Sequence, residues 1–416
     1  MSSNRNAPIR VLIAPDKFKG TLTAYEAAEA MRLGVRDFAA ERDLLIDCIL
    51  RPLADGGEGS RTCLRALHPD MRELQRVFPD SVGRSRQIAA LVADEADRRS
   101  EYLETADIIG LELPGARDVP VPDRSTTGVG RYIQDAIDRA QADGVRELTL
   151  HLFLGGSATC DGGFHLARAI GFEFFDRNNR QVESVRELQY LNRIEPPSPP
   201  TILLSIRAFT DVQNELIGPN GAARLFAQQK GATPAEVEIL EDALNRMGSV
   251  FGPGGNGDHV PPTARAPRYL WPGTGAAGGL IVPLLYWPGV DTRLESGIDF
   301  FLNEAGIQSE LERSETHTID CIVTGEGATD AGSLQGKVIA GLARLSREMR
   351  PDIPLVIVSG RIQDESRLQA AGLDKLFDTV RFCGALQADD WPLSPERATQ
   401  RLRISVHKAL STLFPL

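Results

Sequence analysis

Acidic residues and glycines lie together in Leu53–Ser60, which reads Leu-Ala-Asp-Gly-Gly-Glu-Gly-Ser. Asp55 and Glu58 in this segment carry carboxylates that could ligate Mg²⁺ or supply a general base. Gly56 and Gly57 would let the backbone approach a bound ligand closely. The alternative is an acidic turn before a helix, in which Glu58 only complements the helix dipole. The density of glycines favours the functional interpretation.

A second glycine-rich segment, Gly155–Gly163, follows an alternating apolar strand pattern and precedes a predicted helix. It contains Gly155, Gly156, Ser157 and Asp161, and glycines beside hydroxyls often form a nest of backbone N–H groups that cradles phosphate. The segment does not match a Walker A loop, and Ser157 does not lie in a GxSxG nucleophile motif. A tight strand-to-helix connection is the alternative, and the phosphate cradle is favoured.

Lysines follow the first predicted strand, in Ala14–Gly20, where Asp16, Lys17 and Lys19 precede a helix. A helix N-terminus offers free N–H groups and the lysines add positive charge, so this segment suits an anion. A solvated turn whose lysines point into water is an equally good interpretation of the segment alone.

Carboxylates and a lysine also follow a later strand, in Thr324–Lys337. Gly325, Glu326 and Asp330 come directly after the strand, and Lys337 opens the next helix. The segment fails as a P-loop, because Ala331 stands where Gly is needed and Val338 where Ser or Thr is needed.

Compact polar residues follow another predicted strand: Asp211, Asn214 and Asn220, with Lys230 further on. They could orient a hydroxy-acid substrate, although turn chemistry explains Asp and Asn in loops about as well.

Gly273–Gly278 matches GxGxxG, but no convincing strand precedes it, so we discount a dinucleotide site. Taken together, the loops suit phosphoryl transfer, in which a protein mainly positions groups and neutralises phosphate charge.

Alternating strands and helices must position these loops, which predicts an α/β fold with mainly parallel sheets. In such sheets ligands bind beyond the carboxyl ends of the strands, where these loops lie. Capping boxes at Thr23/Glu26 and Thr233/Glu236 mark two helix starts. The predicted strands are 10–14, 148–154, 203–209, 322–324 and 355–359, and the other predicted helices span 129–140 and 164–170. The segment 251–275 is rich in Gly and Pro, and we expect it to be a surface insertion or a crossing between domains.

Composition narrows the class of protein. The chain has 416 residues, which suggests two or three domains, and its formal net charge of −11 argues against general nucleic-acid binding. The five cysteines form no CxxC pair, which favours a reducing compartment. No apolar segment is long enough to span a membrane. We therefore expect a cytoplasmic protein that binds small molecules and neither nucleic acid nor membrane.

Several of these segments, in this order, resemble motifs of the type I glycerate kinases. They are Ala14–Gly20, Pro52–Gly59, Gly155–Gly163, Gly218–Ala222, Gln229–Thr233 and Thr324–Gly327. The resemblance implies ATP-dependent phosphorylation of glycerate, at the 2-hydroxyl, with Mg²⁺, giving 2-phosphoglycerate. It also implies two α/β domains: a flavodoxin-like domain built from both chain ends (1–75 and 285–416) and a second α/β domain inserted in the middle (76–284), with the active site between them.

The Mg²⁺ ligands and the base are expected among the loop carboxylates Asp55, Glu58, Asp211, Glu326 and Asp330. We favour Asp211 as the base, because it lies between polar residues at a strand end. Asp55, Lys17 and Lys19 are expected as further catalytic groups, and Asp55 and Glu326 as metal ligands. The expected substrate- and nucleotide-binding residues are Asp16, Gly56, Gly57, Glu58, Gly155, Gly156, Ser157, Asp161, Asn214, Asn220, Lys230, Gly325, Glu326, Asp330 and Lys337.

The chain also departs from the family pattern, with Lys17 where Ser is common, Cys160 where Asn is usual and Ala328 where Arg is usual. Two other functions therefore stay open. One is a kinase for a different hydroxy acid, and the other is a non-catalytic protein that binds nucleotide or sugar acid. The sequence does not fix the oligomeric state, for which a homodimer is one expectation.

Overall fold

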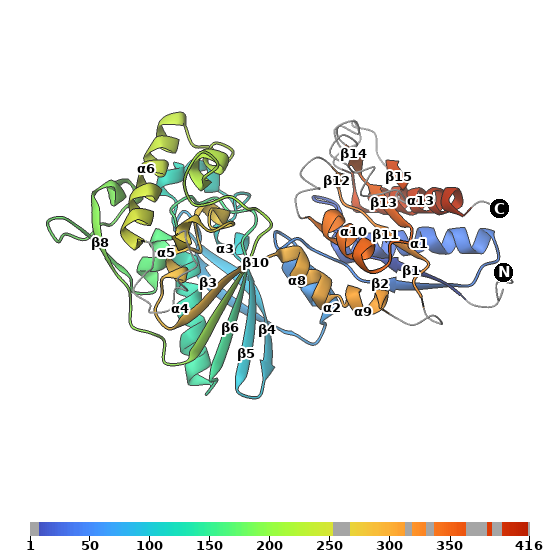
Figure 1. The fold of residues 1–416 in the computed structure, drawn as a ribbon, viewed down its shortest axis with the longest axis horizontal. Helices are drawn as coiled ribbons and strands as arrows, with labels where there is room; N and C mark the ends of the chain where they lie inside the picture. The colour runs from blue at the N-terminus through green and yellow to red at the C-terminus, as the bar shows by residue number, and fades with distance from the viewer. Residues whose placement is uncertain are drawn as a thin grey trace. The chain divides into compact units, whose positions relative to one another are not determined.

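The structure is a computed structural model, and it describes residues 8–252, 267–312, 318–329, 337–362, 381–384 and 393–414. Backbone contacts divide the chain into two compact units (Figure 1). The first comprises 1–55, 62–69 and 296–416, and the second comprises 56–61 and 70–295. The domain boundaries expected near residues 75 and 285 stay predictions. No helix in the described ranges is long and apolar enough to cross a membrane.

The first unit contains a five-stranded sheet in which every pairing is parallel. Its strand order is β2-β1-β11-β13-β15, the order of flavodoxin-like folds, so the predicted fold class is confirmed. The strands are β1 (Ile9–Ile13), β2 (Ile46–Leu50), β11 (Cys321–Thr324), β13 (Leu355–Ser359) and β15 (Arg381–Gly384), and β12 (Ala328–Thr329) pairs separately with β14 (Arg361–Ile362).

Two long helices of the first unit, α1 (Ala24–Glu41) and α13 (Pro395–Leu413), pack side by side (Figure 1). Their apolar faces share one core with Val11, Val323 and Val356 of the sheet. The predicted capping box of α1 is present, since Thr23 and Glu26 bond each other's backbone N–H. The other helices among the described residues of this unit are α8 (Gly297–Glu304), α9 (Ile307–Leu311) and α10 (Val338–Met349). Of α2 (Ser60–Leu67), residues 60–61 are assigned to the second unit and 62–67 to the first.

The second unit contains a six-stranded sheet with the order β10-β9-β6-β5-β4-β3. The first four strands pair with one another in parallel, whereas β4 pairs antiparallel with both β5 and β3. The strands are β3 (Arg72–Pro79), β4 (Ser85–Glu95), β5 (Arg98–Glu104), β6 (Glu147–Phe153), β9 (Leu203–Phe209) and β10 (Val290–Glu295), and β7 (Glu173–Asp176) pairs with β8 (Leu191–Glu195).

Helices pack on this sheet through alternating strand residues. Leu148, Leu150 and Leu152 of β6 point into a core shared with α4, α5 and α6, which confirms the alternation seen in the sequence. The α-helices of the unit are α3 (Ala106–Ile109), α4 (Thr127–Ala142), α5 (Phe164–Ala169), α6 (Pro234–Phe251) and α7 (Val282–Leu285). The 3₁₀ turns are η1 (Ala116–Asp118), η2 (Val121–Asp123), η3 (Val185–Tyr190), η5 (Arg268–Leu270) and η6 (Ala276–Gly278), and η4 (Ala223–Ala227) is a π-helical turn.

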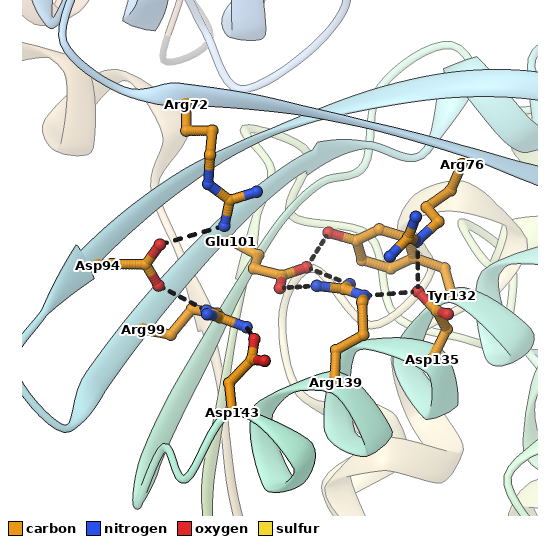
Figure 2. A network of polar contacts seen from close by, with 9 residues as sticks. All are labelled: Arg72, Arg76, Asp94, Arg99, Glu101, Tyr132, Asp135, Arg139 and Asp143. Carbon is orange, nitrogen blue, oxygen red and sulfur yellow. Dashed lines mark hydrogen bonds and ion pairs between the residues drawn. The ribbon is translucent and has the colours of Figure 1, made fainter.

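A buried polar network fastens α4 to the sheet (Figure 2). At its centre the fully buried Glu101 accepts two hydrogen bonds from the Arg139 guanidinium, at 2.6 and 2.9 Å, and one from the Tyr132 hydroxyl, at 2.9 Å. Arg99 donates to Asp94 and Asp143 at 2.6 and 2.8 Å. Because every charge at the centre has a partner of opposite charge, the network can be buried without leaving an unpaired ion in the protein interior.

Candidate active site

The carboxyl ends of β1 and β11 meet in the first unit, at the point where the strand order reverses. Ligands of doubly wound sheets bind at such a switch point. The Ala14 N–H donates to the Val323 carbonyl at 2.8 Å, and the Asp16 N–H donates to the Gly325 carbonyl at 2.9 Å. These backbone hydrogen bonds continue the β1–β11 pairing beyond the last residue of β1, so the loop after β1 runs beside the loop after β11. Two predicted segments are thereby brought together.

Glycines allow these loops to approach each other. A Cβ on Gly325 would lie 1.8 Å from the Val358 carbonyl oxygen, so no other residue fits there without a shift. A Cβ on Gly327 would lie 3.1 Å from the Lys19 backbone nitrogen. Packing therefore requires the glycine at 325 and makes position 327 tight, and the approach at Gly327 places the exposed Lys19 beside the Glu326 loop.

A cluster of carboxylates surrounds Lys17 at this switch point. The Lys17 ammonium lies 3.8 Å from an Asp16 carboxylate oxygen and 3.9 Å from one of Asp55. Burial raises the pKa of Asp16 to about 7, an effect that Lys17 opposes and the neighbouring carboxylates Asp55 and Glu326 increase. Glu326 is buried and accepts a hydrogen bond from the Thr329 hydroxyl at 3.2 Å. We call Asp16, Lys17, Asp55 and Glu326 the switch-point cluster.

The negative charge of the cluster exceeds its positive charge, which suits a cation bound together with an anionic ligand. Within the described ranges no three His, Cys, Asp or Glu side chains form a ready-made metal cage. Mg²⁺ is usually held by one or two carboxylates and by substrate phosphates, so the donor set of the cluster fits it. Lys337 is half-buried and precedes α10, whereas the predicted binding residue Asp330 lies outside the described residues.

The second unit gathers another set of loops at the carboxyl edge of its sheet. The loops after β5, β6 and β9 share this edge because these strands are parallel. A Cβ on Gly155 would lie 2.6 Å from the Gly57 Cα, so the two predicted glycine-rich loops are in contact. Asp211 follows β9 and is half-buried, and Glu58 is exposed. The structure thus brings Gly56, Gly57, Gly155 and Gly156 together.

Two buried cations hold the Gly155–Gly163 loop. The Lys230 ammonium donates to the Ser157 hydroxyl at 3.0 Å and to the Thr159 carbonyl at 2.7 Å. Arg124 donates to the carbonyls of Ala158 and Lys230, both at 3.0 Å. Burial lowers the pKa of Lys230 to about 8, and the nearby Arg124 charge adds to this effect. These cations make the base of the loop positive, which favours an anion on it.

Of three further predicted binding residues, Asp161 and Asn214 take part in the packing of this loop region and Asn220 does not. Asp161 is fully buried and accepts hydrogen bonds from Thr126, Gly163 and His165. Although burial raises the pKa of Asp161, these hydrogen bonds hold it below its ordinary value. The Asn214 carbonyl accepts the Gly275 N–H at 3.0 Å, and Asn220 is exposed in a turn. Their predicted ligand contacts stay predictions.

Gly273–Gly278, which matches GxGxxG, follows a 3₁₀ turn and not a strand. A Cβ on Gly278 would lie 2.3 Å from the Thr159 carbonyl oxygen, so this segment packs against the Gly155–Gly163 loop. The decision to discount a dinucleotide fingerprint is confirmed.

Sequence reasoning missed the residues around the end of β5. The carboxylate of Glu104 is buried and accepts the Arg61 N–H at the start of α2, at 2.6 Å. Burial raises the pKa of Glu104, and the Arg61 N–H opposes that shift. Arg98–Glu104 is polar at most positions, so its sequence gave no strand signal and its last residue was not considered. The available signal was the position of Glu104, an acidic residue at the carboxyl end of a strand in the sheet that also carries the Gly155–Gly163 loop.

Comparisons with known proteins agree with these observations. The family model described as the glycerate kinase family matches residues 11–403. Glycerate 2-kinase of Escherichia coli K12 is 28% identical over 382 residues, covering 91% of this chain and 92% of that protein. Glycerate kinase of Bacillus subtilis 168 is 30% identical over 391 residues, covering 92% of each. A solved structure from Salmonella typhimurium LT2, provisionally assigned as glycerate kinase 2, has a TM-score of 0.73, 26% identity and 98% coverage of both chains.

Proposed function

The chain belongs to the glycerate kinase family and is a kinase, and on that premise we propose that it transfers the γ-phosphoryl group of ATP to the 2-hydroxyl of glycerate. The products are 2-phosphoglycerate and ADP. The observation that carries the proposal is the switch-point cluster, in which three carboxylates and one ammonium gather at the ligand-binding edge of a flavodoxin-like sheet.

Asp55 and Glu326 would hold Mg²⁺, and both of these carboxylates act on Asp16. Mutual repulsion helps to raise the pKa of Asp16, and a divalent cation is the natural compensation for such a site. When bound, Mg²⁺ neutralises charge on the ATP phosphates. Lys19 and Lys337 lie on the loops of the same unit and supply further positive charge toward phosphate oxygens, as point charges and not as forked donors.

Asp211 acts as the general base in this proposal. It follows β9 at the sheet edge that also carries the Gly155–Gly163 loop. Its carboxylate accepts the proton of the glycerate 2-hydroxyl while the hydroxyl oxygen bonds to the γ-phosphorus and the bond to the ADP oxygen breaks. The backbone N–H groups of Gly155–Ser157, above the buried Lys230, stabilise oxyanions.

The direct test is ³¹P NMR of the product formed from ATP, Mg²⁺ and D-glycerate, with a panel of other hydroxy acids in parallel. The proposal expects 2-phosphoglycerate and stoichiometric ADP. A 3-phosphoglycerate signal would overturn the assigned hydroxyl. Turnover of a different acid alone would overturn the assigned substrate, and thermal stabilisation by ATP or glycerate without turnover would overturn catalysis.

A further inference from the structure

A surface pocket of the second unit is lined by two arginines and two glutamines. The pocket is formed by Arg61, Gln75, Arg86, Gln87 and Asp107, together with two apolar residues of β4. Guanidinium groups offer paired N–H donors that match a carboxylate in a two-pronged geometry. The Gln87 amide donates to the Gln75 amide oxygen at 2.5 Å, and the Gln75 amide donates to Glu73 at 3.3 Å. The second N–H of each amide and the Gln87 oxygen are the donors and acceptor that suit hydroxyl groups. The lining therefore has the chemistry of a site for a small hydroxy acid.

The charge of this pocket is incompletely balanced. An Arg61 Nη lies 3.3 Å from an Asp107 carboxylate oxygen, and the Arg86 Nε donates to the Asp107 backbone carbonyl at 2.8 Å. Among the described residues no carboxylate lies within 4.0 Å of the Arg86 guanidinium, and the buried Arg61 Nε has no hydrogen-bond partner. The two guanidinium groups thus share one lining carboxylate. Glu104, the other carboxylate that acts on Arg61, does not line the pocket, and burial raises its pKa.

The position of the pocket links it to the proposed reaction. In the β4–β5 pairing Leu91 lies opposite Tyr102, and this register puts Ala89 level with Glu104, the last residue of β5. The pocket therefore lies at the carboxyl edge of the parallel strands. The Arg61 N–H donates to Glu104, and Gly57, just before Arg61 in the chain, contacts Gly155. The two glycine-rich loops and the pocket are parts of one edge.

We propose that Arg61 and Arg86 bind the carboxylate of the acceptor substrate, while Gln75 and Gln87 face its hydroxyl groups. This inference rests on the proposed function and names the part of the second unit that selects a hydroxy acid. Arg61 and Arg86 are substrate-binding residues in this proposal, and Asp107 is a positioning residue that holds Arg61 and Arg86 at the pocket wall.

The test compares Arg61→Met and Arg86→Met with Arg84→Met. Arg84 lies on the same hairpin, but its guanidinium donates to the Pro114 carbonyl at 2.8 Å and does not line the pocket. We expect each pocket variant to raise KM for D-glycerate at least about tenfold, with KM for ATP and kcat changed less than about twofold. Arg84→Met should match the wild type. Equal changes in both KM values, or no change for glycerate, would overturn the inference.

An equilibrium measurement separates this inference from the proposed function. The rise in melting temperature is recorded with D-glycerate alone and with inorganic phosphate alone, for the wild type and both pocket variants. The inference expects glycerate to stabilise the wild type and neither variant, whether or not the wild type turns glycerate over. Stabilisation by phosphate alone that both variants lose would overturn the carboxylate assignment. If Arg61→Met fails to fold, Arg86→Met carries the test, because Arg86 belongs to β4 and not to α2.

Discussion

Glu101, in strand β5 of the second unit, and Asp16, in the loop after β1 of the first, are both buried carboxylates, yet their surroundings are opposite. Glu101 accepts two bonds from one guanidinium and a third from Tyr132 (Figure 2). Asp16 has one ammonium at 3.8 Å and faces two further carboxylates, which helps to raise its pKa to about 7. A paired charge of the first kind fastens elements together. A cluster with surplus charge of one sign costs stability, and it is retained where a ligand supplies the missing charge.

The largest effect is expected from Glu101→Gln, because the substitution leaves the half-buried Arg139 beside a neutral amide. Removing one partner of a fully buried pair costs about 3–5 kcal/mol, and because Arg139 keeps its ion pair with Asp135 we expect about 2–3 kcal/mol. Thermal and urea unfolding should therefore show a marked loss of stability. Asp138→Asn, at an exposed position of the same helix, is the control and should change stability by less than about 0.5 kcal/mol. Equal stability of both variants would break the comparison.

Asp55→Asn should have the opposite effect to Glu101→Gln: activity should fall and stability should not. Because it removes a like charge beside Asp16, the fold should keep its stability, whereas kcat should fall at least about 10²-fold through loss of the proposed cation and phosphate positioning. Asp211→Asn should lower kcat by a similar factor through loss of the proposed base. The control Asp47→Asn breaks an ion pair with Arg10 on the edge of the same unit and should leave kcat unchanged. Full activity of folded Asp55→Asn and Asp211→Asn would place the site elsewhere.

His151, in β6 of the second unit, makes the stability of the fold depend on pH. Its ring stacks on Tyr102 with a centroid distance of 4.2 Å, and burial with the Arg207 charge lowers the pKa of His151 to about 3. The unfolded chain therefore binds more protons at pH 3–6.5, so stability falls as pH falls through that window. We expect the wild type to lose on the order of 3 kcal/mol more than His151→Phe between pH 7 and pH 4. Equal losses in the urea midpoints of the two proteins would contradict this account.

The smallest effect is expected from Lys17→Met. This substitution, like Arg139→Met in the network, removes a cation from a buried carboxylate. Arg139→Met strands Glu101, but Asp16 can take up a proton near neutral pH and need not stay charged. Lys17→Met should therefore cost less than about 1 kcal/mol at pH 6, against several for Arg139→Met. A larger loss for Lys17→Met in thermal unfolding would mean that the ammonium is structural.

Much of the fold could be predicted because the signals are local. Apolar alternation and capping boxes located β6, β9, α1 and α6 to within a few residues. The polar strands β3 and β5 were missed, since charged and polar residues hold most of their positions and the two strands are stabilised by pairing with β4 and β6. Tertiary pairing of this kind leaves no periodic apolar pattern in a single sequence.

The candidate site was predicted in parts but not as an assembly. Glycine- and carboxylate-bearing loops were visible in the sequence, yet the neighbours of Asp16 come from segments more than 300 residues apart, as the Asp16–Gly325 hydrogen bond shows. The buried Arg124 beneath the Gly155 loop and the Arg61–Arg86 pocket were missed because an isolated arginine has no spacing signal. Only the strand order and register place these side chains together.

The most direct test of this account is ADP release from MgATP and D-glycerate by Asp16→Asn and Glu101→Gln, assayed at a temperature at which both variants are folded. The account predicts that Asp16→Asn is as stable as the wild type with kcat lowered at least about 10²-fold, whereas Glu101→Gln melts earlier and keeps its kcat. A folded, fully active Asp16→Asn, or a stable but inactive Glu101→Gln, would contradict the division between a catalytic cluster and a structural network.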